Sequence, residues 1–310
     1  MWFTPSYNER PSADSYIEAI GQKPEDYRVL SRMPLNVDMI PYRFPGAGEP
    51  ARSVAILDTE TTGLTDNADV IDLAILRCGV DASNQLCCID EVYSGLNDPG
   101  RPIPPHIAEL TGITDEMVKG QSIEKSTVHH ILRDDPVIVA HNAAFDRPLF
   151  EKLFPNDDHN WACSMEYCGW YRRGFETKKL EILLEREGFF YDAHRAYMDC
   201  LAVAFLLHLV PESLAEILEP RIKITAVKSP IDVKDVLKKR GYRWDGMVWS
   251  KNVVRKEYGK AHGMVPDESP YAITTVEVER TFLRKLYRHG RMARVRSINL
   301  RKEFKKQSNR

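Results

Sequence analysis

Residues 54–64 read VAILDTETTGL, and this stretch decides the fold. Its first four residues form an apolar run that predicts a buried strand. The run ends in two acids, Asp58 and Glu60, and residues two apart in a strand point to the same face of the sheet. Two carboxylates held side by side repel unless a cation lies between them, and carboxylate oxygens suit Mg²⁺ or Mn²⁺. The alternative is a solvated strand end with two surface acids, so further acids are needed to decide.

A second acid follows another apolar run. Residues 136–140 predict a buried strand, and residues 141–146 then read HNAAFD. Asp146 therefore falls in the first turn of a helix, from which it can point back to the sheet edge that carries Asp58 and Glu60. Acids also favour helix N-termini because of the helix dipole. Alone, Asp146 is either a helix-start residue or a metal ligand.

The third motif opens an apolar helix that ends near Val210. Residues 192–200 read DAHRAYMDC, which places His194 five residues before Asp199. Both side chains can face one point if His194 lies in the loop and Asp199 within the helix. A single histidine at a helix start is commonly structural, so the combination of motifs carries the argument.

The pattern of elements predicts an α/β domain over residues 51–215. Two β-rich runs, at 70–80 and 86–93, continue the first strand as a meander, and helices then alternate with the strand at 136–140. This order favours a mixed central sheet with helices on its faces. The expected helices of that part include residues 145–154, 180–188 and 193–210. Residues 1–50 contain many prolines and predict an N-terminal arm.

Charge divides the chain into an acidic body and a basic C-terminal part. Residues 221–310 carry 24 Lys and Arg against 9 Asp and Glu, whereas the other 220 residues carry 19 against 36. This asymmetry favours a polyanionic partner such as nucleic acid, although two domains that balance each other's charge would give the same counts. Residues 220–310 predict a small α+β accessory domain. Within it, Asp245-Gly246 predicts a two-residue hairpin in which Trp244 opposes Met247 and Tyr242 opposes Trp249.

Composition sets limits on the class of protein. The 310 residues suffice for one large or two modest domains. No apolar stretch approaches the roughly 18–20 residues of a membrane span, and the N-terminus does not resemble a secretory signal. The six cysteines fit reduced thiols. We therefore expect a cytoplasmic protein without a membrane partner.

Together the three motifs resemble those of the DEDDh 3′–5′ exonucleases, a DnaQ-like family whose best-known member is the proofreading (epsilon) subunit of bacterial DNA polymerase III. The resemblance covers about residues 52–210, with all three motifs intact. It implies an RNase H-like fold and removal of nucleotides from a 3′ end. The basic C-terminal part is more weakly similar to an extension found in some bacterial members.

The resemblance also implies roles for individual residues. The acids Asp58, Glu60, Asp146 and Asp199 match the family's metal ligands, and His194 matches its general base. Two divalent ions, Mg²⁺ or Mn²⁺, activate the attacking water and offset charge on the phosphoryl oxygens and the leaving alkoxide. An imidazole can take the proton of the attacking water. The residues placed to meet the terminal nucleotide are Thr61, Gly63, Leu64, Asn142 and Phe145, for which turn and core packing are equally good explanations.

We therefore expect a two-metal 3′–5′ exonuclease that releases nucleoside 5′-monophosphates from DNA. An exoribonuclease acting on RNA 3′ ends would use the same residues. A non-catalytic nucleic-acid-binding protein of the same fold is a third possibility, against which the intact acids and His194 argue. A polymerase or repair partner is compatible with the sequence, which does not identify one.

Overall fold

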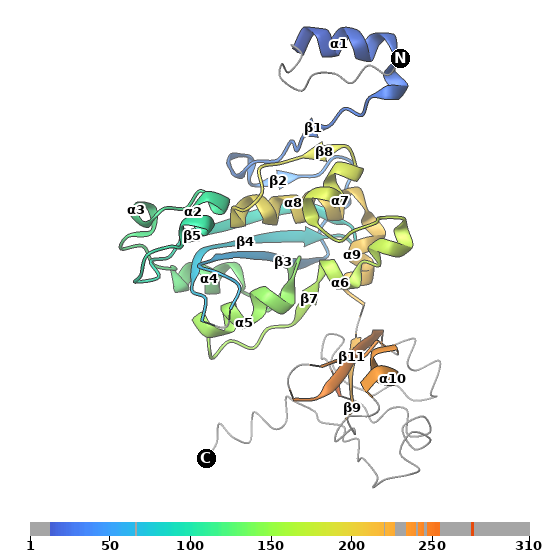
Figure 1. Ribbon diagram of the computed structural model, residues 1–310. Helices are drawn as coiled ribbons and strands as arrows, with labels where there is room; N and C mark the ends of the chain where they lie inside the picture. Colours follow the sequence, from blue (N-terminus) through green and yellow to red (C-terminus); the bar gives the residue numbers. More distant parts are fainter. Residues whose placement is uncertain are drawn as a thin grey trace, which may run out of the picture.

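The computed structural model describes residues 13–65, 67–219, 221–226, 234–239, 241–244, 247–254 and 274–275. Its centre is one mixed sheet of six strands in the order β2-β5-β4-β3-β6-β7 (Figure 1). The six strands are β2 (Tyr42–Arg43), β3 (Arg52–Thr61), β4 (Val70–Val80), β5 (Leu86–Leu96), β6 (Val137–Ala140) and β7 (Trp161–Cys163).

The stretch that carries Asp58 and Glu60 lies in β3, in the middle of this sheet. The strands β3, β4 and β5 form the predicted antiparallel meander, and β3 pairs in parallel with β6 on its other side. The bounds of β4 agree with the prediction, while β5 continues beyond Tyr93 to Leu96. The sequence did not predict the short outer strands β2 and β7. The mixed sheet with helices on both faces confirms the predicted RNase H-like architecture.

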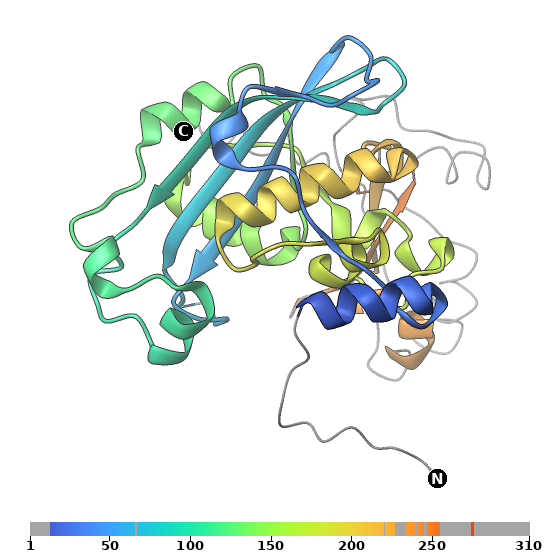
Figure 2. The same ribbon diagram turned by 90° about the horizontal axis from the view of Figure 1, so that it is seen from above.

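Side chains of β3 alternate between two hydrophobic cores. Val54 and Ile56 belong to the core under the helices α7 (Leu180–Arg186), α8 (Ala196–Leu209) and α9 (Pro211–Ile217). Ala55 and Leu57 belong to the core under α4 (Lys125–Ile131) and α5 (Ala143–Leu153). This is the period-2 alternation of a strand buried on both faces. Figure 2 shows α8 lying across the sheet. Its Cys200 Sγ lies 3.6 Å from the Ile56 carbonyl oxygen, so α8 packs directly on β3.

The helices are short except for two that flank the site. The α-helices of the exonuclease-like part are α2 (Pro105–Thr111), α3 (Asp115–Val118), α4 (Lys125–Ile131), α5 (Ala143–Leu153), α6 (Ser164–Tyr167), α7 (Leu180–Arg186), α8 (Ala196–Leu209) and α9 (Pro211–Ile217). The helix α8 begins at Ala196, three residues later than predicted, so His194 lies in the preceding loop.

Part of the predicted N-terminal arm packs into the domain. The helix α1 (Ala13–Gln22) has no buried residue, but Met33, Leu35 and Phe44 are buried in the core under α8. Between them and α1, the strand β1 (Ser31–Arg32) pairs in parallel with β8 (Phe189–Phe190).

The described C-terminal residues form a second, four-stranded sheet in the order β10-β11-β9-β12. Its elements are β9 (Arg221–Ala226), α10 (Lys234–Lys239), β10 (Arg243–Trp244), β11 (Trp249–Val254) and β12 (Thr274–Thr275). This is consistent with the predicted α+β module. Residues 255–273 and 276–310 of the predicted accessory domain lie outside the described residues.

The predicted register of the C-terminal hairpin is wrong. Trp244 pairs with Trp249 instead of Met247. This register places the two indole rings 5.6 Å apart between centroids, a cross-strand aromatic contact that the two-residue turn would not make. The side chains also do not share one environment, because Tyr242 and Trp249 are buried while Trp244 and Met247 are exposed.

No single helix in the described ranges is long and apolar enough to cross a membrane. The consecutive helices α8 and α9 pass such a test only as a pair, and they are bent by 108° relative to each other.

The packing of the N-terminal segment predicts a measurable contribution to stability. We expect Leu35→Ala to lower the free energy of unfolding by about 2–4 kcal/mol, because the Leu35 side chain is only 3 % exposed and its removal leaves a cavity. Val29→Ala, at a 65 % exposed position six residues earlier, is the matched control and should change it by less than about 0.5 kcal/mol. Urea unfolding of both variants measures the difference. Equal small changes would show that this segment does not belong to the folded core.

Candidate active site

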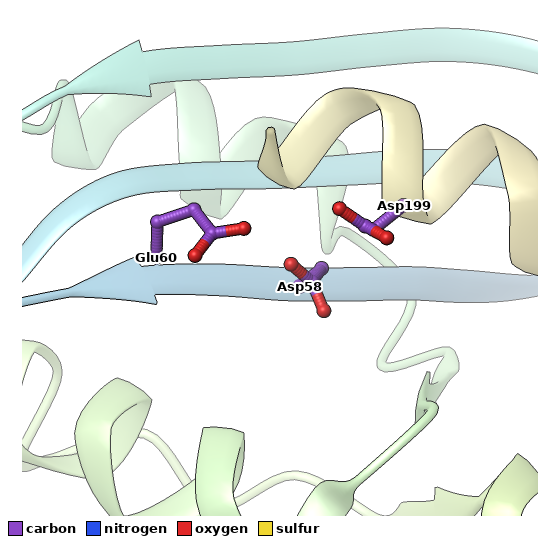
Figure 3. A group of neighbouring side chains, drawn as sticks. All are labelled: Asp58, Glu60 and Asp199. Carbon is purple, nitrogen blue, oxygen red and sulfur yellow. The ribbon is translucent and has the colours of Figure 1, made fainter. Parts of the chain in front are cut away.

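Three of the predicted acids converge at the end of the central strand. Asp58 and Glu60 project from β3, and Asp199 projects from the first turn of α8 toward them (Figure 3). Each contributes a carboxylate oxygen, and the three oxygens lie within 4.8 Å of one another. Among the described residues this is the one group of three or more potential metal-ligating side chains so close together. The convergence follows from strand geometry, since Asp58 and Glu60 continue the face on which Val54 and Ile56 contact the core under α8.

The fourth acid, Asp146, approaches from the opposite face of β3. It lies in the first turn of α5 and is only 2 % exposed. The Thr59 hydroxyl, between the two strand acids in sequence, donates a hydrogen bond of 2.8 Å to Asp146 Oδ1. Thr59 thus fixes the position of Asp146 beside the other acids. Thr59 was not predicted as a site residue, although the same alternation that paired Asp58 with Glu60 assigns Thr59 to the α5 face.

Burial raises the pKa of all four carboxyl groups, and repulsion from neighbouring acids adds to it. The pKa of Asp58 lies well above its usual range, first because of burial and then because of the charges of Asp146, Asp199 and Glu60. Burial, followed by the neighbouring acids, raises the pKa of Glu60 to about 8. Burial is also the largest cause for Asp146, whose pKa rises to about 7, and for Asp199, whose pKa rises to about 6.

Such a site strongly favours an added positive charge. The four carboxyl groups offer only hard oxygen donors, which are the ligands that Mg²⁺, Mn²⁺ and Ca²⁺ prefer. A divalent cation among them would remove the repulsion that raises their pKa values. The donor set therefore fits a divalent metal.

Asp199 is held by hydrogen bonds at both of its oxygens. Tyr191 Oη donates to Oδ1 at 2.7 Å, and the backbone amides of His194 and Arg195 donate to Oδ2 at 2.8 and 3.2 Å. These donors leave the carboxylate a single orientation. Tyr191 was not predicted, because nothing in its spacing distinguishes it from the two phenylalanines that precede it.

His194 joins the acid cluster through its backbone. Its φ of 67° is in the left-handed region, which few residues other than glycine adopt, and this conformation turns its amide toward Asp199. The imidazole is 43 % exposed, with Nε2 3.7 Å from Glu181 Oε1 of α7. The ring therefore extends toward Glu181 and solvent at the rim of the site.

The predicted substrate-contacting residues divide into two groups. Leu64 is 87 % exposed just beyond β3, and Asn142 is exposed at the start of α5, so both are open to a ligand. Thr61 is buried and its hydroxyl donates to the Gly63 carbonyl oxygen, while Phe145 packs partly against the core under α5. For Thr61 and Phe145 the structure shows internal contacts.

His141, adjacent to the second motif, has a structural environment. Its Nδ1 lies 2.8 Å from Ser164 Oγ and its Nε2 lies 2.7 Å from the Lys178 carbonyl oxygen. Burial lowers the pKa of His141 to about 4, so the ring is neutral near pH 7. It connects the end of β6 to the segment before α7.

A fifth acid on the same face of the sheet was also missed. Asp72 of β4 lies opposite Glu60 in the strand ladder, is completely buried and forms an ion pair with Arg195. The available signal was an acid inside the almost wholly apolar run of residues 70–80.

Comparisons with known proteins agree with this geometry. Residues 55–207 match the RNase_T family model, described as an exonuclease. The DNA polymerase III PolC-type protein of Listeria welshimeri is 31% identical over 181 residues, which cover 54% of this chain and 12% of that protein. The DNA polymerase III subunit epsilon-like protein of Rhodobacter capsulatus is 37% identical over 95 residues, covering 29% of this chain and 13% of that protein. The matches thus span only about an eighth of the length of these two relatives.

For a shorter relative and two solved structures, the match covers a larger share of the other protein. The protein named uncharacterized exonuclease CP81 of Escherichia phage 186 is 29% identical over 166 residues, covering 46% of this chain and 80% of that protein. A structure of exonuclease X in complex with 5′ overhanging duplex DNA aligns with a TM-score of 0.41 and 26% identity, over 53% of this chain and 96% of that one. A zinc-bound complex of E. coli exonuclease I with single-stranded DNA aligns with a TM-score of 0.47 and 16% identity, over 65% and 62% of the two chains. The family match and the PolC-type and epsilon-like relatives confirm the prediction made from the three motifs: residues 55–207 are an exonuclease domain similar to those of the DnaQ-like enzymes.

Proposed function

We propose that the protein is a metal-dependent exonuclease that hydrolyses DNA from the 3′ end and releases nucleoside 5′-monophosphates. The observation that carries this proposal is the group of carboxylate oxygens from Asp58, Glu60 and Asp199, within 4.8 Å of one another and next to buried Asp146. The direction of digestion rests on the resemblance of the three motifs to the DEDDh enzymes. The names of the PolC-type and epsilon-like relatives support DNA as the substrate.

The four acids would hold two divalent ions, either Mg²⁺ or Mn²⁺. When bound, these ions supply an activated water and electrostatic stabilisation of the phosphoryl group and leaving oxygen. The chain's part is to keep its carboxylates in position. Thr59 fixes Asp146, and Tyr191 together with two backbone amides fixes Asp199. Fixed ligands need no reorganisation during the reaction.

His194 would accept the proton of the attacking water. Its imidazole, 43 % exposed at the rim of the acid cluster, has access to solvent and to a bound strand. A general base is often poorly aligned until substrate binds. The exposed side chains of Leu64 and Asn142 would meet the terminal nucleotide, and the basic excess of residues 221–310 suits a polyanionic substrate.

The first prediction concerns the metal-dependent reaction itself. On 5′-labelled single-stranded DNA with Mg²⁺, we expect products that shorten progressively from the 3′ end, and a chelator should abolish them. Asp58→Asn should lower the rate by at least about 100-fold, because it removes a charged metal ligand while keeping the shape of the side chain.

Asp158→Asn, at an exposed acid, is the matched control and should retain the wild-type rate. Matched RNA and duplex DNA measure the preference for sugar and strand. Shortening from the 5′ end, or full activity of Asp58→Asn, would contradict the proposal.

The second prediction concerns His194. We expect His194→Ala to lower kcat by roughly 10²–10⁴-fold, the usual contribution of a positioned general base. Mn²⁺ affinity should remain within a few-fold of wild type, because the backbone amide that holds Asp199 remains. His130→Ala, at an exposed histidine of α4, serves as the control. A loss of only a few-fold in kcat would assign His194 a structural role.

The third prediction follows from the raised pKa of Glu60. In chelator, wild-type protein should lose stability relative to Glu60→Gln as pH rises from about 4.5 to about 8. The sign follows because ionised Glu60 is unfavourable in the folded state. The stability that protonated Glu60 contributes is fully present below its ordinary pKa, and it is lost as the pH rises through the raised pKa of the folded state. We expect Glu60→Gln to be more stable by roughly 1–3 kcal/mol at pH 8.5.

Urea unfolding at pH 5 and pH 8.5 measures this difference. Added Mg²⁺ should reverse it at pH 8.5, because a ligand that binds the folded wild-type protein stabilises it. A constant difference between the variants across this pH range would show that Glu60 is not destabilised by its neighbours.

A further inference from the structure

A buried acid without a role in the proposed reaction lies next to the site. Asp72 projects from β4 on the face shared with Glu60, its partner in the strand ladder. Its side chain is only 1 % exposed. Burying a charge is unfavourable unless it is paired and hydrogen-bonded, and here four other carboxyl groups already repel one another. Asp72 therefore needs an interaction that outweighs its electrostatic cost.

That interaction is with Arg195. The guanidinium Nε donates to Asp72 Oδ2 at 3.2 Å, across 123 residues of sequence. The other oxygen, Asp72 Oδ1, is buried without a hydrogen-bond partner in the part of the chain that the structure describes. Asp72 Oδ2 thus pairs with a cation that belongs to the segment of the third motif, and the backbone amides of Ala196 and Leu73 also stabilise the carboxylate.

Arg195 is the residue at which the loop of His194 becomes the helix α8. Its carbonyl oxygen accepts from the amides of Met198 and Asp199, at 2.8 and 3.0 Å, and so closes the first turn of α8. Its own amide donates to Asp199 Oδ2 beside the amide of His194. A side-chain anchor on Arg195 therefore fixes the backbone that holds Asp199 and presents His194.

The positive charge of Arg195 also affects the neighbouring acids. The guanidinium is close enough to Glu60 to lower its pKa, against the effects of burial and the neighbouring acids. A cation so close to four carboxyl groups would compete with a divalent metal if it turned toward them. Pairing with Asp72 holds the guanidinium at the β4 side of the cluster.

We propose that the Asp72–Arg195 ion pair has a positioning role. It anchors residues 194–199 to β4 and so fixes the relative positions of the metal ligand Asp199 and of His194. The proposal rests on the proposed metal-dependent function for its effect on catalysis. Its structural part is independent of that function, because it concerns how firmly two backbone amides are held.

The test uses Asp72→Asn, Arg195→Gln and the double variant in the full-length chain. Three quantities are measured: hydrogen exchange of the His194 and Arg195 amides without metal, Mn²⁺ affinity by electron paramagnetic resonance, and kcat with KM. Arg77→Gln is the matched control, because Arg77 is a buried arginine at the far end of β4, bonded to the Ile131 carbonyl oxygen and to Asp134. It should lower stability without changing any of the three quantities.

The Arg195→Gln variant distinguishes the loss of positioning from the direct electrostatic effect of removing a positive charge near the acids. Removal of a positive charge beside the acids would by itself tighten Mn²⁺ binding. We expect the opposite, a roughly 10–100-fold weaker affinity with a comparable loss in kcat and little change in KM, since loss of a supporting contact to a metal site has effects of that size. Exchange of the two amides should accelerate in both single variants. The double variant should be no worse than the more impaired single variant, because both act through one contact.

Several outcomes would overturn the proposal. These are tighter Mn²⁺ binding by Arg195→Gln, amide exchange at wild-type rates in both single variants, or a double variant that shows the product of the two effects. If Asp72→Asn does not fold, Arg195→Gln carries the test, because its side chain is the more exposed member of the pair. If the wild-type protein shows no nuclease activity, the proposed function fails, while amide exchange and Mn²⁺ affinity still decide the positioning role.

Discussion

The main constraint on this structure is the mutual repulsion of carboxyl groups that the fold brings together out of water. Asp58, Glu60, Asp146 and Asp199 come from three elements, and burial raises the pKa of each. Hydrophobic packing of α8 and α5 against the two faces of β3 supplies the free energy that offsets this repulsion. The site is thus an electrostatically unfavourable region held in place by a well-packed sheet, and its donor set fits a divalent cation.

The topology explains why these acids meet. The strands β3 and β6 are parallel neighbours, so their carboxyl ends lie at one edge of the sheet, where sites of α/β proteins commonly form. The segment after β6 leads within three residues into α5 and delivers Asp146 to that edge. The helix α8 delivers Asp199 from the other face. One strand with alternating side chains can therefore present two acids to α8 and, through Thr59, orient a third on α5.

The long, strongly patterned elements could be predicted from the sequence, as could the four acids. The bounds of β4 and the main part of α8 agree, because their apolar runs are continuous and deeply buried. The short strands β2 and β7 could not be predicted, since strands this short have no periodicity of their own. Tyr191, Thr59 and the pair of Asp72 with Arg195 were missed because each is defined by one contact between distant residues. The hairpin register failed because a contact between Trp244 and Trp249 outweighed the local preference of Asp245-Gly246.

Segments that precede and follow residues 55–207 both contact the exonuclease domain. On the N-terminal side, Ser31 donates from its amide to the Gly188 carbonyl oxygen, and Arg32 pairs with Asp192 at 2.7 Å, two residues before His194. On the C-terminal side, Arg243 pairs at 2.9 Å with Glu166 of α6, two residues after Ser164, the partner of His141. Both attachments reach segments that lead into the catalytic motifs rather than the rigid sheet. Because loops have fewer internal constraints than strands, added contacts have most influence there. The chain's own N- and C-terminal segments therefore contact segments that lie close in sequence to its exonuclease motifs.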